Sequence, residues 1–407
     1  MRSTSVGVRG RMWLALSLGL AVVLAVVGAL AGFRTMAASA SPEKLSDGEL
    51  LSKVSRAPED APNFSASLTI EQGLIPAQIL EAAGQESGFA ASGPQTARVW
   101  YGGPGKLRAE LQGDNGDRIF VTDGERAWAY NGATNTLRTG ERPPEPRTSE
   151  LPDPENPPTP VEIDRMLAEL APTSELTQGT PVRYAGREAY VMTLRPKDAG
   201  TTLVDHARAL VDSETFLPLE LALYAQGKPD PVFSWRVSGL DVDTVPAERF
   251  QFQTPPGARV ITFDSESREE RHEPEMPAGA EPKEVETVAE AQRLVDFEIR
   301  ELASPPGGRE LTGVYLKGAD GVVLTYGSGW GTVILAQGPQ KDDASMPRPE
   351  AAGGDPALPM VDLGGVEATE LSTPVGTGLR WNADGVSYAL AGSVTAPELE
   401  RAARELR

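Results

Sequence analysis

Five short segments between residues 97 and 138 constrain the fold of this chain more than any other feature of its sequence. Tight turns with the sequences GGPG, GDNG, DGE and NGAT separate them. Strands that follow one another this closely pair as antiparallel neighbours. The sequence therefore predicts one antiparallel sheet, with strands at 97–101, 106–111, 117–122, 126–131 and 136–138.

Further segments with a period of two extend this sheet. One precedes the five segments, at 63–70, and the others follow them at 182–185, 188–194, 203–211, 217–225 and 232–240. Leu219, Leu221 and Leu223 occupy every second position of one segment, which predicts one apolar face. Amphipathic helices are expected at 46–56, 74–83 and 160–171, where capping residues and apolar spacing favour them. We expect these helices to lie against the apolar face.

Composition excludes several classes of function. The 407 residues carry a net charge of −20, which repels nucleic acid phosphates. The absence of cysteine excludes disulfides, thiolate metal sites and the lipidated cysteine of a lipoprotein. Only two histidines are present, so a histidine-rich zinc site is excluded as well. Hydrophobic residues make up 40% of the chain, enough for a sizeable core.

The N-terminal 40 residues predict export. Arginines precede an unbroken apolar run at 13–33, which as a helix rises about 31 Å, close to the thickness of a bilayer. More arginines precede the run than follow it, so the remainder of the chain should lie outside the cytoplasm. The small residues around Ala40 also fit a signal-peptide cleavage site. A retained single-pass anchor and a secreted protein cleaved after Ala40 both remain open.

Two soluble domains are expected after this segment. The first spans 45–262, and an acidic, proline-rich linker at 263–285 follows it. The second, at 286–407, combines hairpins with a terminal helix that Thr395 and Glu398 should cap. Its insertion at 338–360 has no periodicity and is expected to be flexible.

Catalytic signatures are missing from the sequence. No nucleotide-binding loop, zinc-protease motif or serine-nucleophile elbow occurs. The glycine-rich segments 102–105 and 327–331 stand at strand ends without a following helix, which favours turns or bulges. His206 beside Asp205 fits a strand position better than a general base, because no nucleophile accompanies it. Residues 113–117 lack the ligand spacing of a calcium loop. We therefore predict a binding protein with no catalytic residues, no cofactor and no metal.

Two interpretations of the sheet remain open. The expected helices present little apolar surface for so many strands, which favours a curved sheet whose concave side is only partly filled. Such a cavity would suit an acyl chain, because burial stabilises it by about 0.8 kcal/mol per methylene group. Alternatively, the helices fill the sheet completely and the domain is a packed sandwich.

Four motifs resemble those of the LolA-like lipoprotein carriers. They are the strand pair at 98–111, the hairpin VTDGERAWAY at 121–130, the turn LVDSETFLPLEL at 210–221 and the segment FQFQTPPGARV at 250–260. The resemblance implies an α+β fold: an open, half-closed antiparallel β-barrel with a helical lid. The cavity-lining candidates, which include two residues of the helix at 160–171, are Trp100, Leu107, Phe120, Trp128, Tyr130, Met166, Leu170, Met192, Leu221 and Trp235.

The C-terminal domain and the N-terminal membrane helix depart from a freely diffusing carrier. The first expectation is therefore local binding of a lipid or a lipoprotein acyl chain at the outer side of the membrane. The alternative is a regulator similar to RseB of the same superfamily, which would bind a membrane anti-sigma factor and sense envelope lipoproteins. Expected partners are thus an acyl chain, the membrane and a membrane regulatory protein.

Overall fold

The computed structural model describes residues 42–60, 62–74, 94–113, 116–141, 160–263, 283–317, 321–340 and 359–406. The expected membrane segment at 13–33 and the cleavage site at Ala40 lie outside these residues. So do the helix expected at 74–83, apart from Leu74, and most of the linker and of the insertion. Across the described ranges, no helix has the length and apolar character needed to cross a bilayer.

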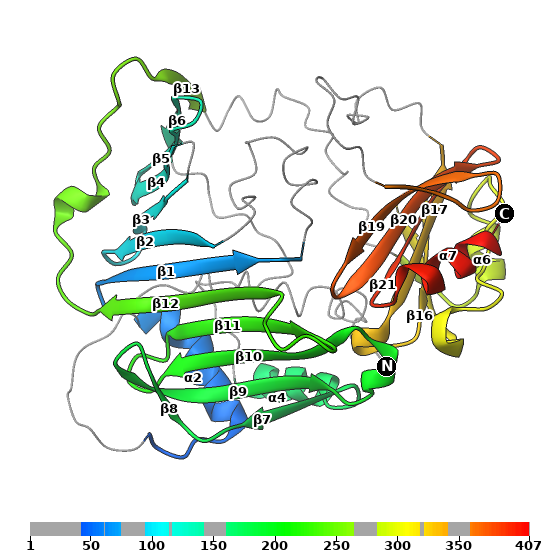
Figure 1. Cartoon of the computed structure of the whole chain (residues 1–407), viewed down its shortest axis with the longest axis horizontal. Helices are drawn as coiled ribbons and strands as arrows, with labels where there is room; N and C mark the ends of the chain where they lie inside the picture. Colours follow the sequence, from blue (N-terminus) through cyan, green and yellow to red (C-terminus); the bar gives the residue numbers. More distant parts are fainter. Residues whose placement is uncertain are drawn as a thin grey trace, which may run out of the picture.

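A 13-stranded sheet dominates the N-terminal unit (Figure 1). Its order is β13-β6-β5-β4-β3-β2-β1-β12-β11-β10-β9-β7, and β8 also pairs with β9. The strands in the first half are β1 (Phe64–Gln72), β2 (Gln95–Tyr101), β3 (Lys106–Leu111), β4 (Arg118–Asp123), β5 (Arg126–Asn131) and β6 (Thr136–Glu141). The others are β7 (Ser174–Gln178), β8 (Val182–Tyr184), β9 (Arg187–Pro196), β10 (Val204–Asp212), β11 (Pro218–Ala225), β12 (Phe233–Asp241) and β13 (Arg259–Phe263).

The expected antiparallel sheet is confirmed except at one edge. The paired strands run antiparallel except β13, which lies parallel to β6. The physical reason is the strap, residues 242–258, which carries the chain from β12 back across the sheet, so that β13 enters in the direction of β6 (Figure 1). Strands β13 and β7 are the two ends of the strand order, so the sheet is open and no closed barrel forms.

Two helices lie against one face of the sheet, in the half formed by β7–β12. They are α2 (Asp47–Asp60) and α4 (Pro160–Leu170), close to the ranges expected from the sequence (Figure 1). Ser46 and Glu49 form the expected capping pair, since the Ser46 backbone N–H donates to Glu49 Oε2 at 2.8 Å. Gly48 of α2 faces Asp164 and Leu167, so α4 packs on α2.

The C-terminal unit is an eight-stranded sheet in the order β14-β15-β16-β17-β21-β20-β19-β18. Its strands are β14 (Lys283–Val285), β15 (Leu311–Lys317), β16 (Gly321–Tyr326), β17 (Val333–Pro339), β18 (Met360–Asp362), β19 (Glu367–Thr373), β20 (Gly376–Ala383) and β21 (Val386–Gly392). The helices are α6 (Val288–Gln292) and α7 (Ala396–Arg404). Strands β14, β18 and β19 were not predicted, and β14 occupies the end of the expected linker.

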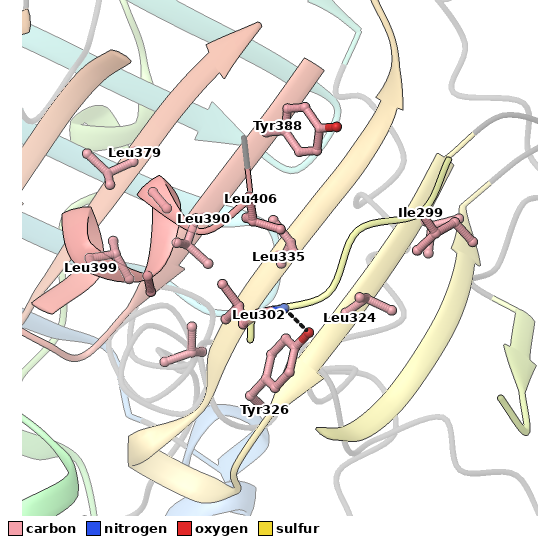
Figure 2. Packing of buried hydrophobic residues seen from close by; sticks show 14 of the residues in the cluster. Ile299, Leu302, Leu324, Tyr326, Leu335, Leu379, Tyr388, Leu390, Leu399 and Leu406 are labelled. Atoms are coloured by element: carbon pink, nitrogen blue, oxygen red, sulfur yellow. Dashed lines mark hydrogen bonds between the residues drawn. The ribbon is translucent and has the colours of Figure 1, made fainter. Parts of the chain in front are cut away.

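A dense apolar core holds this unit together (Figure 2). Leu324, Leu335 and Leu390 are fully buried, and Leu399 of α7 packs into the same cluster. The hydroxyl of Tyr326 accepts a hydrogen bond from the backbone N–H of Leu302 at 2.9 Å (Figure 2). The C-terminal unit therefore has a core of its own.

The two units meet through a polar joint formed by Ser174, Thr201, Leu203, Arg309, Trp330 and Ser393. The Trp330 indole N–H donates to Ser174 Oγ at 2.9 Å, and Arg309 Nη2 donates to the Thr201 carbonyl oxygen at 2.5 Å. The Leu203 backbone N–H donates to Ser393 Oγ at 2.9 Å. Trp330 lies in the glycine-rich segment 327–331, where η4 (Gly329–Gly331) forms a single 3₁₀ turn. The segment expected to be only a turn or bulge thus also connects the units.

Replacing Thr395 with alanine is expected to destabilise the C-terminal unit by about 1 kcal/mol, because Thr395 caps α7. Its side-chain hydroxyl donates to Glu398 Oε2 at 2.6 Å, and its backbone N–H donates at 3.1 Å. These hydrogen bonds lower the pKa of the Glu398 carboxyl from 4.5. The contribution is therefore complete above pH 4.5 and is lost as the pH falls through the lowered pKa. Urea unfolding at neutral and acidic pH measures both effects.

The matched control for this prediction is Glu400→Gln on the same helix, where a partly exposed pair with Arg404 is removed. We expect a change of about 0.3–0.5 kcal/mol there. An equal loss in both variants would contradict a specific capping role for Thr395.

Candidate ligand-binding face

The larger sheet has an inner face, which carries α2 and α4, and an outer face. Residues paired across neighbouring strands point to the same side of a sheet. Leu50 of α2 packs against Tyr190 and Met192 of β9, and Ala57 packs against Phe64 and Tyr101. These contacts show which residues of β1, β2 and β9 face the helices. The register of the paired strands then assigns the residues of the other strands to a face.

The inner face is well packed where the helices cover it. One row runs across five strands through the partners Ile70, Trp235, Leu221, Ala209 and Met192. Leu221 and Met192 are buried, and Trp235 is half-buried. The three candidate residues Met192, Leu221 and Trp235 therefore share the inner face, in the half beneath the helices.

The same inner face continues over β3, β4 and β5, where Leu107, Ala109 and Leu111 are half-buried and Ala127 is buried. Leu107 pairs with Thr122, and Ala109 pairs with Phe120, which in turn pairs with Ala129. Phe120 is 40% exposed, and Ala129 is exposed as well. We call this region the open half; its residues are Leu107, Ala109, Leu111, Phe120, Ala127 and Ala129.

The neighbours of Phe120 on the inner face are small or polar. Both direct partners of Phe120 are alanines, Ala109 and Ala129, and Arg118 and Thr122 flank it on the same strand and face. A single exposed aromatic residue is common on protein surfaces, so the interest of Phe120 comes from its position on the apolar face of the sheet. Sequence reasoning selected Leu107 and Phe120 but missed the alanines, although Ala127 and Ala129 alternate visibly with the two aromatics of β5.

The remaining aromatic candidates lie on the outer face. Trp100 pairs with Arg108, Arg108 pairs with Val121, and Val121 pairs with Trp128. Trp100 and Trp128 therefore point to the same side of the sheet. The strap covers them: the Arg249 guanidinium lies 4.9 Å from the Trp100 ring centroid. Tyr130 contacts Phe252 of the strap, with 5.9 Å between ring centroids. Trp100, Trp128 and Tyr130 are thus separated from Leu107 and Phe120 by the thickness of the sheet.

The two candidates on α4 are placed apart from the open half. Ile163 of this helix is buried and Leu167 approaches Gly48, which directs the apolar side of α4 toward α2. Leu170 is half-buried, whereas Met166 is 40% exposed. Met166 and Leu170 therefore belong to the helical cover.

Charged side chains lie on both faces: Arg118 pairs with Leu111 and Arg138 pairs with Ala129 on the inner face, and several ion pairs lie on the outer face. Glu220 is buried and accepts from Arg208 Nε at 2.9 Å, and Arg236 Nε lies 3.8 Å from its other oxygen. His206 stacks on Tyr224 with 4.2 Å between centroids, and its Nδ1 lies 2.6 Å from Asp205 Oδ2. In the part of the chain that the structure describes, no three acidic or histidine side chains gather as a metal site.

Two surface hollows lined by described residues lie in the C-terminal unit. One of about 390 Å³ is bordered by β14 and β15, and the other, about 450 Å³, lies between Phe297 and Tyr388. Carboxylates such as Asp296 and Asp384 surround the second. Both are polar and distant in the chain from the open half, which is a face of the sheet.

Comparisons with known proteins give similarities only among solved structures. The sequence matches no protein-family model, and no curated protein sequence matches it. The MucA/MucB complex of Pseudomonas aeruginosa contains a chain with 17% identity and a TM-score of 0.40, covering 88% of this chain and 96% of that one. A LolA superfamily protein from Nitrosomonas europaea has 10% identity and a TM-score of 0.21, covering 51% and 99%.

The "putative outer membrane lipoprotein-sorting protein domain" from Vibrio parahaemolyticus has 10% identity and a TM-score of 0.19, covering 48% of this chain and 92% of that one. The structures that this chain resembles thus include the LolA type expected from its motifs. Because these TM-scores are below 0.5, they identify no ligand or partner for this chain.

Proposed function

We propose that this chain binds the acyl chain of a lipid or lipoprotein on the open half of its inner face, without catalysis, at the outer side of the cell membrane. The observation that carries this proposal is the exposure of Phe120 among alanines. It occurs on the same face whose other half is buried beneath α2 and α4. The apolar run at 13–33 supports export and attachment to the membrane.

The energetics favour an acyl chain over a polar ligand. The open half offers apolar side chains from three adjacent strands, with Arg118 and Arg138 at its border on the same face. The ion pairs of Arg208 and Arg236 lie on the outer face. Each methylene group buried there contributes about 0.8 kcal/mol, so ten of them contribute about 8 kcal/mol before the ordering costs of binding. Burial alone is therefore sufficient for a binding function.

Replacing Phe120 with glutamate is expected to lower acyl-chain binding at least 10-fold, because a carboxylate beside the chain must be desolvated. The measurement uses the full chain in phosphatidylcholine vesicles that contain a phospholipid with a diazirine on its acyl chain. After illumination, mass spectrometry locates the label. We expect labelled residues within 106–131 in the natural chain and a 10-fold lower yield in the variant.

Val182→Glu provides a matched control, since Val182 is 39% exposed on β8 at the other end of the sheet. It should leave the labelling of 106–131 unchanged. Competition with a diacylated lipopeptide distinguishes a lipoprotein from a phospholipid as the source of the acyl chain. Label confined to 13–33, or equal labelling in all variants, would overturn the proposal.

A second candidate is a regulator that binds a membrane anti-sigma factor, similar to RseB. The apolar run at 13–33 and the presence of a C-terminal unit, attached through Trp330 and Arg309, support it. Genes for an extracytoplasmic sigma factor and its anti-sigma factor beside this gene, with copurification of that anti-sigma protein from membranes, would support it. Copurification unchanged in a chain lacking residues 283–407 would contradict a role for the C-terminal unit.

A further inference from the structure

Strand β2 carries two buried polar atoms with no hydrogen-bond partner. Four such side-chain atoms occur in the described part of the chain, and two belong to this strand: Gln95 Oε1 and the Tyr101 hydroxyl. Both residues lie on the inner face, because Gln95 pairs with Ile70 and Tyr101 pairs with Phe64. Buried polar groups are nearly always paired, so two exceptions on one strand require a physical explanation.

The Tyr101 hydroxyl is buried among apolar groups. The side chain is 5% exposed, and its ring stacks on Phe64 with 5.6 Å between centroids. Burial raises the pKa of Tyr101 to about 12, so the hydroxyl keeps its proton at neutral pH. It is therefore a hydrogen-bond donor without an acceptor, an arrangement that costs about 1–3 kcal/mol.

The position of Tyr101 connects this unused donor to the open half. Across the next strand it pairs with Leu107, a residue of the open half, and Leu107, Ala109 and Leu111 pack against the cluster that contains Tyr101. Directly opposite residues in a sheet lie about 4.5–5.5 Å apart. Tyr101 thus stands at the boundary between the helix-covered half and the open half.

A ligand that satisfies this donor must combine an apolar chain with an uncharged acceptor. The carbonyl oxygen of an acyl ester has both properties, whereas the ether oxygen of an alkyl lipid is a weaker acceptor without a carbonyl. We propose that Tyr101 is a specificity-determining residue whose hydroxyl donates to the ester carbonyl of the bound acyl group, so that the site prefers ester-linked over ether-linked chains. This inference rests on the proposed function.

Gln95, the other residue of β2 with an unpaired buried polar atom, is the control position for Tyr101. It stands six residues from Tyr101 on the same strand and face, a separation of about 20 Å. Ala97 and Val99 lie between them on that face. The unpaired atom of Gln95, Oε1, is an acceptor, so an ester carbonyl at that end of β2 could accept only from the Gln95 Nε2–H. In that case the loss of Gln95 would change the preference.

The test is competition against the diazirine phospholipid on the full chain, with dipalmitoyl phosphatidylcholine and its dihexadecyl ether analogue as competitors. In the natural chain, we expect the ester lipid to compete at about 10-fold lower concentration, equivalent to about 1.4 kcal/mol. Tyr101→Phe keeps the ring and should abolish the difference by weakening ester binding alone. Gln95→Leu should keep it.

The melting temperature of the unliganded protein gives an independent readout. Removing a buried donor that has no partner should leave the melting temperature of Tyr101→Phe unchanged or raise it. A lower melting temperature, equal competition by both lipids in the natural chain, or loss of the preference only in Gln95→Leu would overturn the inference. Absence of any label within 106–131 would instead remove the proposed acyl site itself, and the inference with it.

Discussion

Asp212→Ala is expected to lower the free energy of unfolding of the N-terminal unit by about 3–5 kcal/mol, because it removes a fully buried carboxylate that is the principal partner of the half-buried Arg187. Asp212 is fully buried at the end of β10. Arg187 donates to both of its carboxylate oxygens, from Nε at 2.7 Å and from Nη2 at 2.8 Å. This hydrogen bonding raises the pKa of the Arg187 guanidinium. The charge persists without the partner because a guanidinium does not lose its proton at neutral pH.

Asp212 also organises the turn between β10 and β11. Its Oδ2 accepts from the Thr215 backbone N–H at 2.9 Å and from the Thr215 hydroxyl at 2.6 Å. One carboxylate therefore pairs with the Arg187 charge and also accepts the hydrogen bonds of the turn. For this reason the expected loss of stability exceeds that of an ordinary ion pair. Urea unfolding of the full chain measures the loss, and native-state hydrogen exchange should place it at the amides of β10 and β11.

Glu214→Ala is the matched control, because Glu214 pairs with the same arginine at 2.8 Å but is 54% exposed. We expect at most about 1 kcal/mol there. If the two variants were equally stable, burial of Asp212 would have no energetic consequence and this account of the turn would be wrong.

The elements predicted correctly are those whose signals are local. Tight turns at 102–105 and 123–125 fix neighbouring strands, and capping pairs such as Ser46 with Glu49 fix where helices begin. The strands that were missed have weak local signals. In β7 the only apolar residue is Leu176, and its pairing with Leu194 of β9 is a tertiary contact. Likewise, the parallel pairing of β13 depends on the path of the strap.

Which face each side chain takes was harder to predict than the strands themselves. In β5, Trp128 and Tyr130 alternate with Ala127 and Ala129, and both sets are compatible with a buried face. The strap decides between them, because Phe252 packs on Tyr130 from the outer side. A search for large aromatic liners therefore selects the outer side of this strand, whereas the small residues opposite Phe120 lie on the inner side.

The polar joint could not be found from the sequence because it needs two segments far apart in the chain to meet. Gly331 faces Thr201 so closely that an added Cβ would lie 2.8 Å from the Thr201 carbonyl oxygen and 2.9 Å from its Oγ1. Similarly, a Cβ on Gly329 would lie 2.5 Å from Cβ of Thr173, which follows α4. Here the glycines of 327–331 permit close approach between the units, a role that a strand-end turn does not require.

Gly331→Ala is therefore expected to open the joint. The backbone at Gly331 does not have the left-handed conformation that favours glycine, so the added methyl group acts only through its collision with Thr201. Relief requires the units to separate, which breaks the hydrogen bond from Trp330 to Ser174 and the one from Arg309 to Thr201. Overpacking of this kind typically costs about 1–3 kcal/mol.

The absence of natural cysteines makes this opening directly measurable. Cysteines introduced at Val182 and Met360, both exposed and in different units, accept spin labels whose separation pulsed electron paramagnetic resonance reports. We expect a narrow distance distribution in the labelled parent chain and a broad one with Gly331→Ala. Gly378→Ala is the control, because nothing lies within 4 Å of its added Cβ. A narrow distribution in all three chains would mean that contacts other than the joint hold the end of α4 to the C-terminal unit.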